Sequence, residues 1–375
     1  MSSAEILTIG TEILLGEIVD TNTRHIALTL RELGVDLYRT VTIGDNVERI
    51  AAAIRDSMAH AEIIITTGGL GPTVDDPTRE AVAKALGVET EFREELWQQV
   101  TAAIKKYGRK PAENQKRQAL VPKGALGVLN PVGTAPAFIV ERGRNSIISL
   151  PGVPNEMEYI LHESIVPYLQ KRFDLHEVIK VRVLHTSGLG EGTVDEKIGD
   201  LETLPNPTVG LAAHTGVVDI RIAAKAQGEA EAQAMIADIE GRIRARLGDA
   251  VFGVDDDRLE KVVLDLLAKR GWSLTAIESG LNGLLARKLP NVTSLTGLTA
   301  VSLMEALRAA HADSKTDVAL GVTVHIADHS ADMALITPRG EKTHRTTYGG
   351  PPSSLPRWAM NLALNWLRTV AQESD

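Results

Sequence analysis

A glycine-rich turn joins a predicted strand to a predicted helix in the segment IITTGGLGPTVDDPTREAVAKAL, which runs from Ile64 to Leu86. The β-branched run at residues 63–67 is typical of a buried strand, and the apolar stripe of residues 79–86 is typical of a helix. Glycines let the backbone approach a ligand closely, and a loop that leads into a helix N-terminus suits an anion such as phosphate. We therefore predict that a phosphate lies against Gly68, Gly69, Gly71 and Thr73.

Carboxylates follow the same glycines, and they require a cation if a phosphate is to bind there. Asp75 and Asp76 are adjacent, and two bare carboxylates would repel a phosphate. A hard divalent cation (Mg²⁺, Co²⁺ or Mn²⁺) resolves the conflict, because it takes carboxylate and phosphate oxygens together and keeps several waters. Asp45, in the turn TIGDN after another predicted strand, could complete the cluster. We predict that Asp45, Asp75 and Asp76 bind the metal and activate a water that cleaves a phosphoanhydride.

A purely structural interpretation stays open for several of these residues. Asp76 precedes Pro77, and an N-cap aspartate followed by proline at N1 is a common start of a helix. Asp45 could likewise cap the helix that follows its turn, and the three glycines could serve turn geometry alone. Asp75 is not needed for a cap, which favours a role in the site.

Strands and helices alternate along the N-terminal part of the chain. Short strands are predicted at residues 5–9, 35–41 and 62–67, separated by amphipathic helices that end at Gly34 and Met58. This alternation predicts an α/β fold with a mostly parallel, doubly wound sheet, in which ligands gather at the carboxyl ends of strands. Polar or glycine-rich turns follow predicted strands at residues 10–22, 44–46, 68–76, 130–138 and 147–157.

Further polar residues in and near these turns are candidates for contacts with a substrate. We expect the pocket for ribose or base to be lined by Glu12, Asp20, Asn22, Gly133, Thr134 and Gly152. Asn114 and Lys116, with Arg117, could supply contacts to phosphate from the segment ENQKRQALVP. Asp20 also fits the N-cap of the helix that follows it, so a structural role stays open for this residue.

The pattern of the chain changes near residue 172. An alternating strand, a short helix, another alternating strand and a long amphipathic helix that ends at Gly248 predict a small α+β domain. A third, helix-rich domain is expected after it. The predicted domains are residues 1–171, 172–252 and 253–375, and the last is expected to be of the α/β class.

The composition excludes several classes of protein. The 375 residues, 43% hydrophobic and 24% charged, are ordinary for a globular protein of two or three domains. A net charge of −9 disfavours a dedicated nucleic-acid binder, and cysteine is absent, which excludes disulfides and thiolate catalysis. No secretory signal is evident, and no apolar run approaches the roughly 20 residues that span a bilayer. We expect a cytoplasmic protein that binds neither membrane nor nucleic acid.

Several segments together, in this order, closely resemble the CinA family (competence/damage-inducible protein A). The residues that carry the resemblance are GTEILLGEIVDTN, TIGDN, TTGGLGPTVDDPTREA, NPVGTAPAF and LPGVPNEM. The similarity is strong from Ala4 to about Asp255 and weak beyond it. The glycine–aspartate core is also similar to the molybdopterin-binding fold of MoaB, MogA and gephyrin, in which the aspartates that match Asp45 and Asp76 lie at the pterin and adenylate site.

The resemblance implies a MoaB/MogA-like molybdopterin-binding domain, a small KH-like connecting domain and a C-terminal domain, assembled as a homodimer. Members of the family hydrolyse the pyrophosphate of ADP-ribose in the first domain, with a divalent metal, to AMP and ribose 5-phosphate. Many also deamidate nicotinamide mononucleotide in the last domain. The first activity agrees with the interpretation of the loops. RNA binding is not expected of the KH-like domain here, because this segment is not notably basic.

The C-terminal domain departs from the family's pattern. An active deamidase carries a segment like T-A-E-S-C-T-G-G, whereas this chain has TAIESGLNG, in which Ser279 matches the nucleophile. The family's tyrosine and lysine, near Y-S-N-x-x-K, have no counterpart between Leu289 and Leu307, and Lys315 lies in the dissimilar setting HADSKTD. A serine needs a nearby base to become a competent nucleophile. We therefore expect this domain to be inactive in amide hydrolysis and to serve packing or dimerisation.

The sequence as a whole favours a metal-dependent pyrophosphatase that acts on ADP-ribose or a close relative. One alternative is that Ser279 retains deamidase activity on nicotinamide mononucleotide through a base that the sequence does not reveal. Another is a non-catalytic scaffold that binds a nucleotide or pterin in competence or the DNA damage response.

Overall fold

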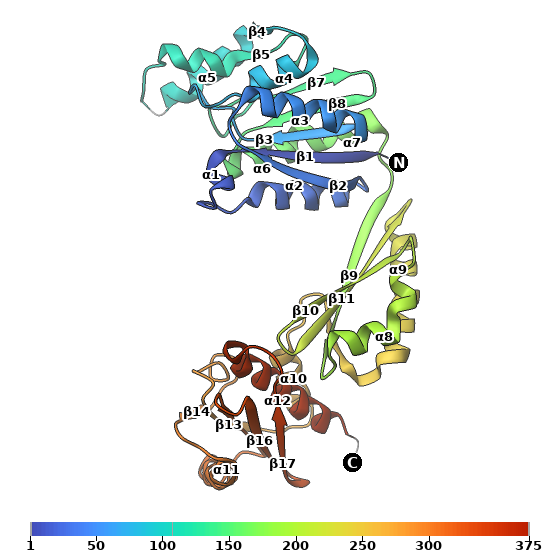
Figure 1. Ribbon diagram of the computed structural model, residues 1–375, viewed down its shortest axis with the longest axis vertical. Coiled ribbons are helices and arrows are strands. Elements are labelled where there is room, and N and C mark those ends of the chain that lie inside the picture. Colours follow the sequence, from blue (N-terminus) through green and yellow to red (C-terminus); the bar gives the residue numbers. More distant parts are fainter. Residues whose placement is uncertain (1, 107, 374–375) are drawn as a thin grey trace. The chain divides into compact units, whose positions relative to one another are not determined.

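The computed structural model describes residues 2–106 and 108–373, which form two compact units (Figure 1). The first unit is the chain up to Lys180 together with Lys225–Ala232, and the second is Val181–Ala224 and the residues from Gln233 onward. No helix in the described part of the chain combines the length and the apolar character that crossing a membrane requires.

A six-stranded sheet forms the centre of the first unit. Its first four strands are parallel, and the last two run antiparallel to their neighbours. In sheet order the strands are β2 (Asp36–Ile43), β1 (Ser3–Ile9), β3 (Ile63–Thr67), β8 (Asn145–Leu150), β7 (Ala137–Arg142) and β6 (Leu126–Val128). The predicted doubly wound sheet is confirmed, with two antiparallel strands added at one edge.

Helices cover both faces of this sheet (Figure 1). One face packs its buried side chains against α2 (Thr21–Glu32), α6 (Pro154–Ile160) and α7 (Val166–Phe173). The opposite face packs against α3 (Val47–His60), α4 (Thr78–Leu86) and α5 (Glu94–Lys106). Ile6 and Leu7 belong to different cores, as do Ile64 and Ile65, because successive strand residues point to opposite faces.

The loop after β1 contains more structure than the sequence indicated. A short helix, α1 (Thr11–Leu14), begins directly after Gly10, and α2 begins at Thr21 with Asp20 as its N-cap. Beside the main sheet lie a two-stranded antiparallel pair, β4 (Thr90–Phe92) with β5 (Leu120–Pro122), and the 3-10 helix Glu113–Ala119.

Two sheets form the rest of the chain. The first has the order β10 (Thr208–His214), β11 (Val217–Ala226), β9 (Val178–Ser187) and β12 (Val251–Val254), and its helices are α8 (Glu191–Glu202) and α9 (Glu229–Leu247). The second has the order β14 (Val292–Leu295), β13 (Leu274–Ser279), β15 (Val318–His325), β16 (Ser330–Thr337) and β17 (Gly340–Thr347). Its helices are α10 (Leu259–Lys269), α11 (Ala300–Ser314) and α12 (Leu355–Gln372).

The C-terminal domain combines three helices with this five-stranded sheet, so the expected α/β class is confirmed. Both faces of β15 and β16 are covered, so their residues are almost continuously buried and lack the alternation that reveals a half-exposed strand.

One glycine decides how closely the ends of β1 and β3 approach. Gly68 follows β3 with a φ of +103°, and a Cβ built on it would lie 2.1 Å from the carbonyl oxygen of Ile9. Gly87 has a similar left-handed φ of +66°, but no atom lies within 4 Å of its Cβ position. An alanine at Gly87 would therefore add only conformational strain, whereas an alanine at Gly68 would add strain and a steric clash.

We expect Gly68→Ala to lower the free energy of unfolding by about 2–4 kcal/mol, because strain and a backbone clash add, and Gly87→Ala by about 1 kcal/mol. Urea unfolding of both variants measures the difference. Equal losses in the two variants would contradict the close approach of the strand ends.

Candidate functional site

A cavity of about 540 Å³ opens at the carboxyl ends of the parallel strands, and we call it the main cavity. Most of the residues predicted from the sequence line it, namely Glu12, Asp20, Asn22, Asp45, Gly68, Gly69, Gly71, Thr73, Asp75, Asp76, Thr134 and Gly152. Residues from loops more than a hundred positions apart thus share one site, as expected for the edge of a doubly wound sheet.

A second cavity, also of about 540 Å³, lies beside the first, and we call it the side cavity. It is lined by Pro72, Thr73, Val74, Phe92, Glu113, Asn114, Lys116, Arg117 and Leu120. Pro72 and Thr73 line both cavities. They belong to the glycine-rich turn of residues 68–76, which we call the glycine loop, so this loop separates the two cavities. Asn114 and Lys116 therefore lie next to the predicted phosphate loop rather than in the main cavity.

The carboxylate of Asp76 holds the glycine loop in shape. It accepts hydrogen bonds from the backbone N–H groups of Gly71 (2.8 Å) and Thr73 (2.9 Å), and from the Thr73 hydroxyl. The N-cap interpretation of Asp76 is wrong, because Pro77 is the N-cap of α4 and no side chain caps that helix. The loop also differs from the expected phosphate cradle, since two of its N–H groups already bind Asp76.

Asp45 joins the first two turns of the sheet edge. Its Oδ2 accepts hydrogen bonds from the backbone N–H (2.8 Å) and the hydroxyl (2.7 Å) of Thr11. Capping of the next helix is done by Asn46, whose side chain accepts from the N–H of Arg49, so the capping interpretation of Asp45 is wrong. By contrast, Asp20 does cap α2 and accepts from the N–H of Thr23 at 2.9 Å.

Two buried amide side chains in the main cavity have acceptors without a partner. Asn22 donates from Nδ2 to the Thr67 hydroxyl and to the Gly152 carbonyl, both at 2.9 Å, while its Oδ1 accepts no hydrogen bond. A carbonyl can only accept, which fixes the orientation of this amide. Oε1 of Gln118 is likewise buried without a partner. An atom of this kind costs about 1–3 kcal/mol, and both residues line the main cavity.

Arg79 supports the glycine loop from beneath, and the sequence analysis did not identify it. The side chain is buried and donates to the carbonyl oxygens of Leu70 (2.8 Å) and Gly71 (3.3 Å). Burial lowers the pKa of Arg79 to about 10, and the nearby Asp76 carboxylate raises it, so the guanidinium remains charged at neutral pH. A cation directly behind the loop favours an anion in front of it.

Glu156, at the start of α6, is a second residue that the sequence analysis missed. Its carboxylate accepts a hydrogen bond from Asn130, and burial raises its pKa above the ordinary value. A Cβ on Gly133 would lie 1.9 Å from the carboxyl carbon of Glu156, so Gly133 makes room for this carboxylate rather than lining the cavity. The signal was present in the turns NPVGTAP and LPGVPNEM, which the fold brings together.

The carboxylates of the main cavity suit a hard divalent cation, because all of them offer oxygen. Hydrogen bonding lowers the pKa of Asp75, whose exposed carboxylate is ionised at neutral pH. No group of three or more His, Cys, Asp or Glu side chains in residues 2–106 and 108–373 is arranged to hold a metal ion. Among the described residues, the three aspartates therefore do not form a ready-made metal centre.

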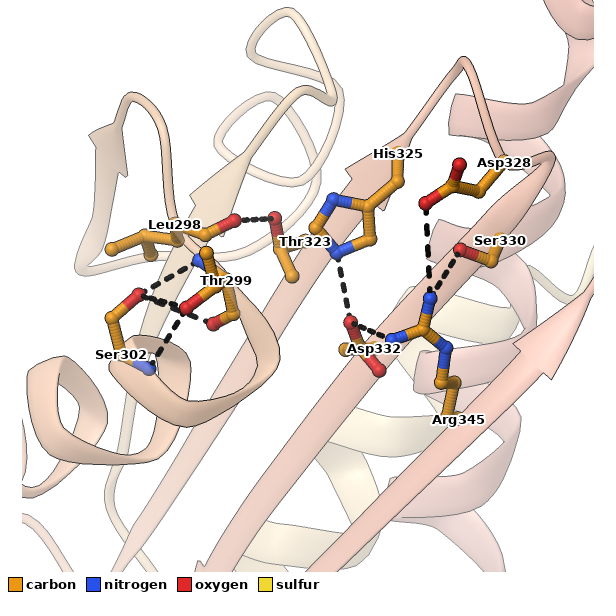
Figure 2. Close-up of polar contacts among 9 residues, drawn as sticks. All are labelled: Leu298, Thr299, Ser302, Thr323, His325, Asp328, Ser330, Asp332 and Arg345. Carbon is orange, nitrogen blue, oxygen red and sulfur yellow. Dashed lines mark hydrogen bonds and ion pairs between the residues drawn. The ribbon is translucent and has the colours of Figure 1, made fainter.

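The C-terminal domain contains a separate polar network at the end of β15 (Figure 2). Figure 2 shows the imidazole of His325 directed at Asp332, and Arg345 beside the same carboxylate. Nε2 of His325 lies 2.8 Å from Oδ2 of Asp332, and Nη1 of Arg345 lies 3.7 Å from the same oxygen. Ser279 ends β13 and pairs in register with Thr323, two residues before His325. The Ser279 hydroxyl makes no hydrogen bond within the described part of the chain, and Lys315 lies at the opposite end of β15.

Two family models match the chain. A probable molybdopterin binding domain matches residues 5–171, and the damage-inducible protein CinA KH domain matches residues 181–253. Every residue that lines the main cavity falls within the first match. The matches agree with a MoaB/MogA-like N-terminal domain and a KH domain after it.

Known proteins are similar to most of the chain, and a solved structure is similar to part of it. A putative competence-damage inducible protein of Caldanaerobacter subterraneus subsp. tengcongensis is 43% identical over 77% of this chain and 69% of its own length. A CinA-like protein of Kosmotoga olearia is 40% identical over 78% of this chain and 71% of its own. The solved structure of CinA from Thermoplasma acidophilum is 35% identical and covers 45% of this chain and 96% of its own, with a TM-score of 0.40.

The raised pKa of Glu156 predicts a pH-dependent loss of stability. The folded chain holds the proton of this carboxyl more tightly than the unfolded chain, where the pKa is near 4.5. The contribution of Glu156 to the free energy of unfolding is therefore fully present below pH 4.5. It is lost as the pH rises through the pKa of Glu156 in the folded chain.

Glu156→Gln removes this titration. We therefore expect the melting temperature of the variant, relative to that of the wild type, to rise between pH 4.5 and 7.5. Thermal unfolding across that range measures the gain. The matched control is Glu163→Gln on the same helical segment, where the side chain is exposed and the difference should stay flat. A difference for Glu156→Gln that does not change with pH would contradict the burial of its carboxyl.

Proposed function

The chain belongs to the CinA family of competence-damage inducible proteins, and we propose that its N-terminal domain hydrolyses the pyrophosphate bond of ADP-ribose to AMP and ribose 5-phosphate. The observation that carries the proposal is the composition of the main cavity. Carboxylates gather at the same sheet edge as two buried amide oxygens without partners. A sugar diphosphate supplies both what such carboxylates bind through a cation and the hydroxyl groups that such acceptors require.

Each side chain has a role in this proposal. One or two of the carboxylates of Asp45, Asp75 and Asp76, together with phosphate oxygens of the substrate, would hold the divalent cation, which when bound neutralises charge on the diphosphate and lowers the pKa of a coordinated water. Arg79 holds the glycine loop and adds positive charge behind it, and Asn22 accepts a hydrogen bond from a ribose hydroxyl. Glu156, the carboxyl of the cavity whose pKa burial raises, is the group best suited to hold a proton there.

We expect the purified protein to release AMP from ADP-ribose in the presence of Mg²⁺, Co²⁺ or Mn²⁺. The release of AMP should stop when EDTA is added. Asp76→Asn should lower kcat at least about 100-fold, because charge stabilisation of the transition state contributes on that scale. Chromatographic quantification of AMP measures the rates.

Asp75→Asn should lower kcat without changing the melting temperature. Asp75 is exposed, and the residue that orders the loop is Asp76. The control is Asp56→Asn, whose carboxylate pairs with Arg39 away from the cavity. Binding of ADP-ribose without turnover under any of the metals would contradict the proposal and favour a non-catalytic scaffold.

For the C-terminal domain we propose that amide hydrolysis is absent. The support is the setting of Ser279, whose strand partner is Thr323 and whose hydroxyl has no base within hydrogen-bonding distance in the described residues. His325 is the basic side chain next along that strand, and its Nε2 is already bound to Asp332. The domain keeps its apolar core, so packing or assembly into a homodimer is the role that we assign to it.

The wild-type protein, incubated with nicotinamide mononucleotide, should therefore release no more ammonia than the Ser279→Ala variant releases. A coupled ammonia assay with both proteins makes the comparison. Turnover in the wild type that disappears in Ser279→Ala would overturn this assignment and restore the deamidase.

A further inference from the structure

The side cavity has no role in the cleavage step itself, yet it adjoins the loop on which the diphosphate would lie. We propose that the side cavity is the nucleobase subsite, which holds the base by stacking on Phe92, and that the main cavity selects the sugar by hydrogen bonds. The proposal rests on the proposed function in one respect, namely that the diphosphate spans the loop residues Pro72 and Thr73, which both cavities share.

Phe92 is an exposed aromatic side chain in a chain that has few. Phenylalanine, tryptophan and tyrosine together make up 3% of the sequence, and Phe92, which lines the side cavity, is 43% exposed. Trp97 packs against it, with 6.5 Å between ring centroids, which restrains the ring from one side. Val74, 82% exposed, lines the same cavity and extends its apolar surface. A restrained ring of this kind is a platform on which a base stacks.

The charges near the loop are arranged for a substrate with a phosphate at its centre. Arg117 lines the side cavity, and its side chain makes no hydrogen bond or ion pair within the described chain, whereas its neighbour Lys116 pairs with Glu113 at 2.8 Å. An unpaired guanidinium suits a phosphate oxygen, which it can bind with two N–H groups. We therefore assign Arg117 to the phosphate on the nucleoside side.

The main cavity, in contrast, is built to recognise hydroxyl groups. Asn22 and Gln118 present buried oxygens that accept no hydrogen bond, and no aromatic residue is among the described residues that line this cavity. A site whose buried acceptors need a donor rejects a ligand that lacks or misplaces it. Stacking, however, tolerates any base, because every base has a π-face. The two cavities together predict strict selection of the sugar and weak selection of the base.

Steady-state kinetics with paired substrates tests this division. Replacing adenine by guanine or cytosine in the ADP-ribose structure should change kcat/KM by less than about tenfold, whereas replacing ribose by glucose should lower it by about 100-fold or more. Phe92→Ala should raise KM for all three bases by about tenfold to 100-fold with little change in kcat, and Phe92→Tyr should restore it. Tyr38→Ala is the matched control, since Tyr38 is an exposed aromatic of β2 that lines neither cavity.

A binding measurement separates failure of the subsite from failure of the proposed reaction. Trp97 is the tryptophan beside Phe92, so AMP should quench its fluorescence, and Phe92→Ala or Trp97→Phe should remove that signal. Gln118→Met should leave AMP binding intact and lower kcat/KM for ADP-ribose. Quenching without any turnover would refute the reaction and keep the subsite. Turnover with an unchanged KM in Phe92→Ala, or AMP binding that Phe92→Ala does not weaken, would overturn the subsite.

Discussion

The contact between backbone segments at the carboxyl edge of the first sheet is the constraint on which the site depends. Gly68 lies against the carbonyl of Ile9, and a Cβ on Gly152 would lie 3.3 Å from the Cα of Gly68. The ends of β1 and β3 can meet because Gly68 has no side chain, and Gly152 leaves little room for a Cβ at the end of β8. Their meeting brings Asn22 within hydrogen-bonding distance of Gly152, a residue 130 positions later in the chain.

Charge is separated across the glycine loop. The main cavity is lined by carboxylates, Arg79 is buried behind the loop, and Arg117 and Lys116 lie in the side cavity. Asp76 belongs to both structure and site, because the same carboxylate that would reach a cation already orders the loop by accepting from Gly71 and Thr73. A cation with a diphosphate would compete with these N–H groups for Asp76, so under the proposed function its binding would be coupled to the conformation of the loop.

The fold of the C-terminal domain depends on its packing and on its polar contacts. Its sheet and three helices enclose a continuous core, and the polar groups at the end of β15 satisfy one another through His325, Asp332 and Arg345 (Figure 2). Packing depends on many side chains, each of which contributes a little, whereas catalysis depends on a few that must be placed together. The first kind of information therefore survives substitutions that remove the second.

The sequence by itself determined the strands β1 and β3, the glycine–aspartate turn between β3 and α4, and the gathering of polar loops at one sheet edge. These follow from local patterns, because periodicity and turn residues act over a few positions. Only the tertiary structure decided which partner each side chain takes. Asp76 binds the loop before it, Asp45 binds Thr11, and Glu156 fills the space that Gly133 leaves. These contacts depend on how distant segments approach in space, which no local pattern records.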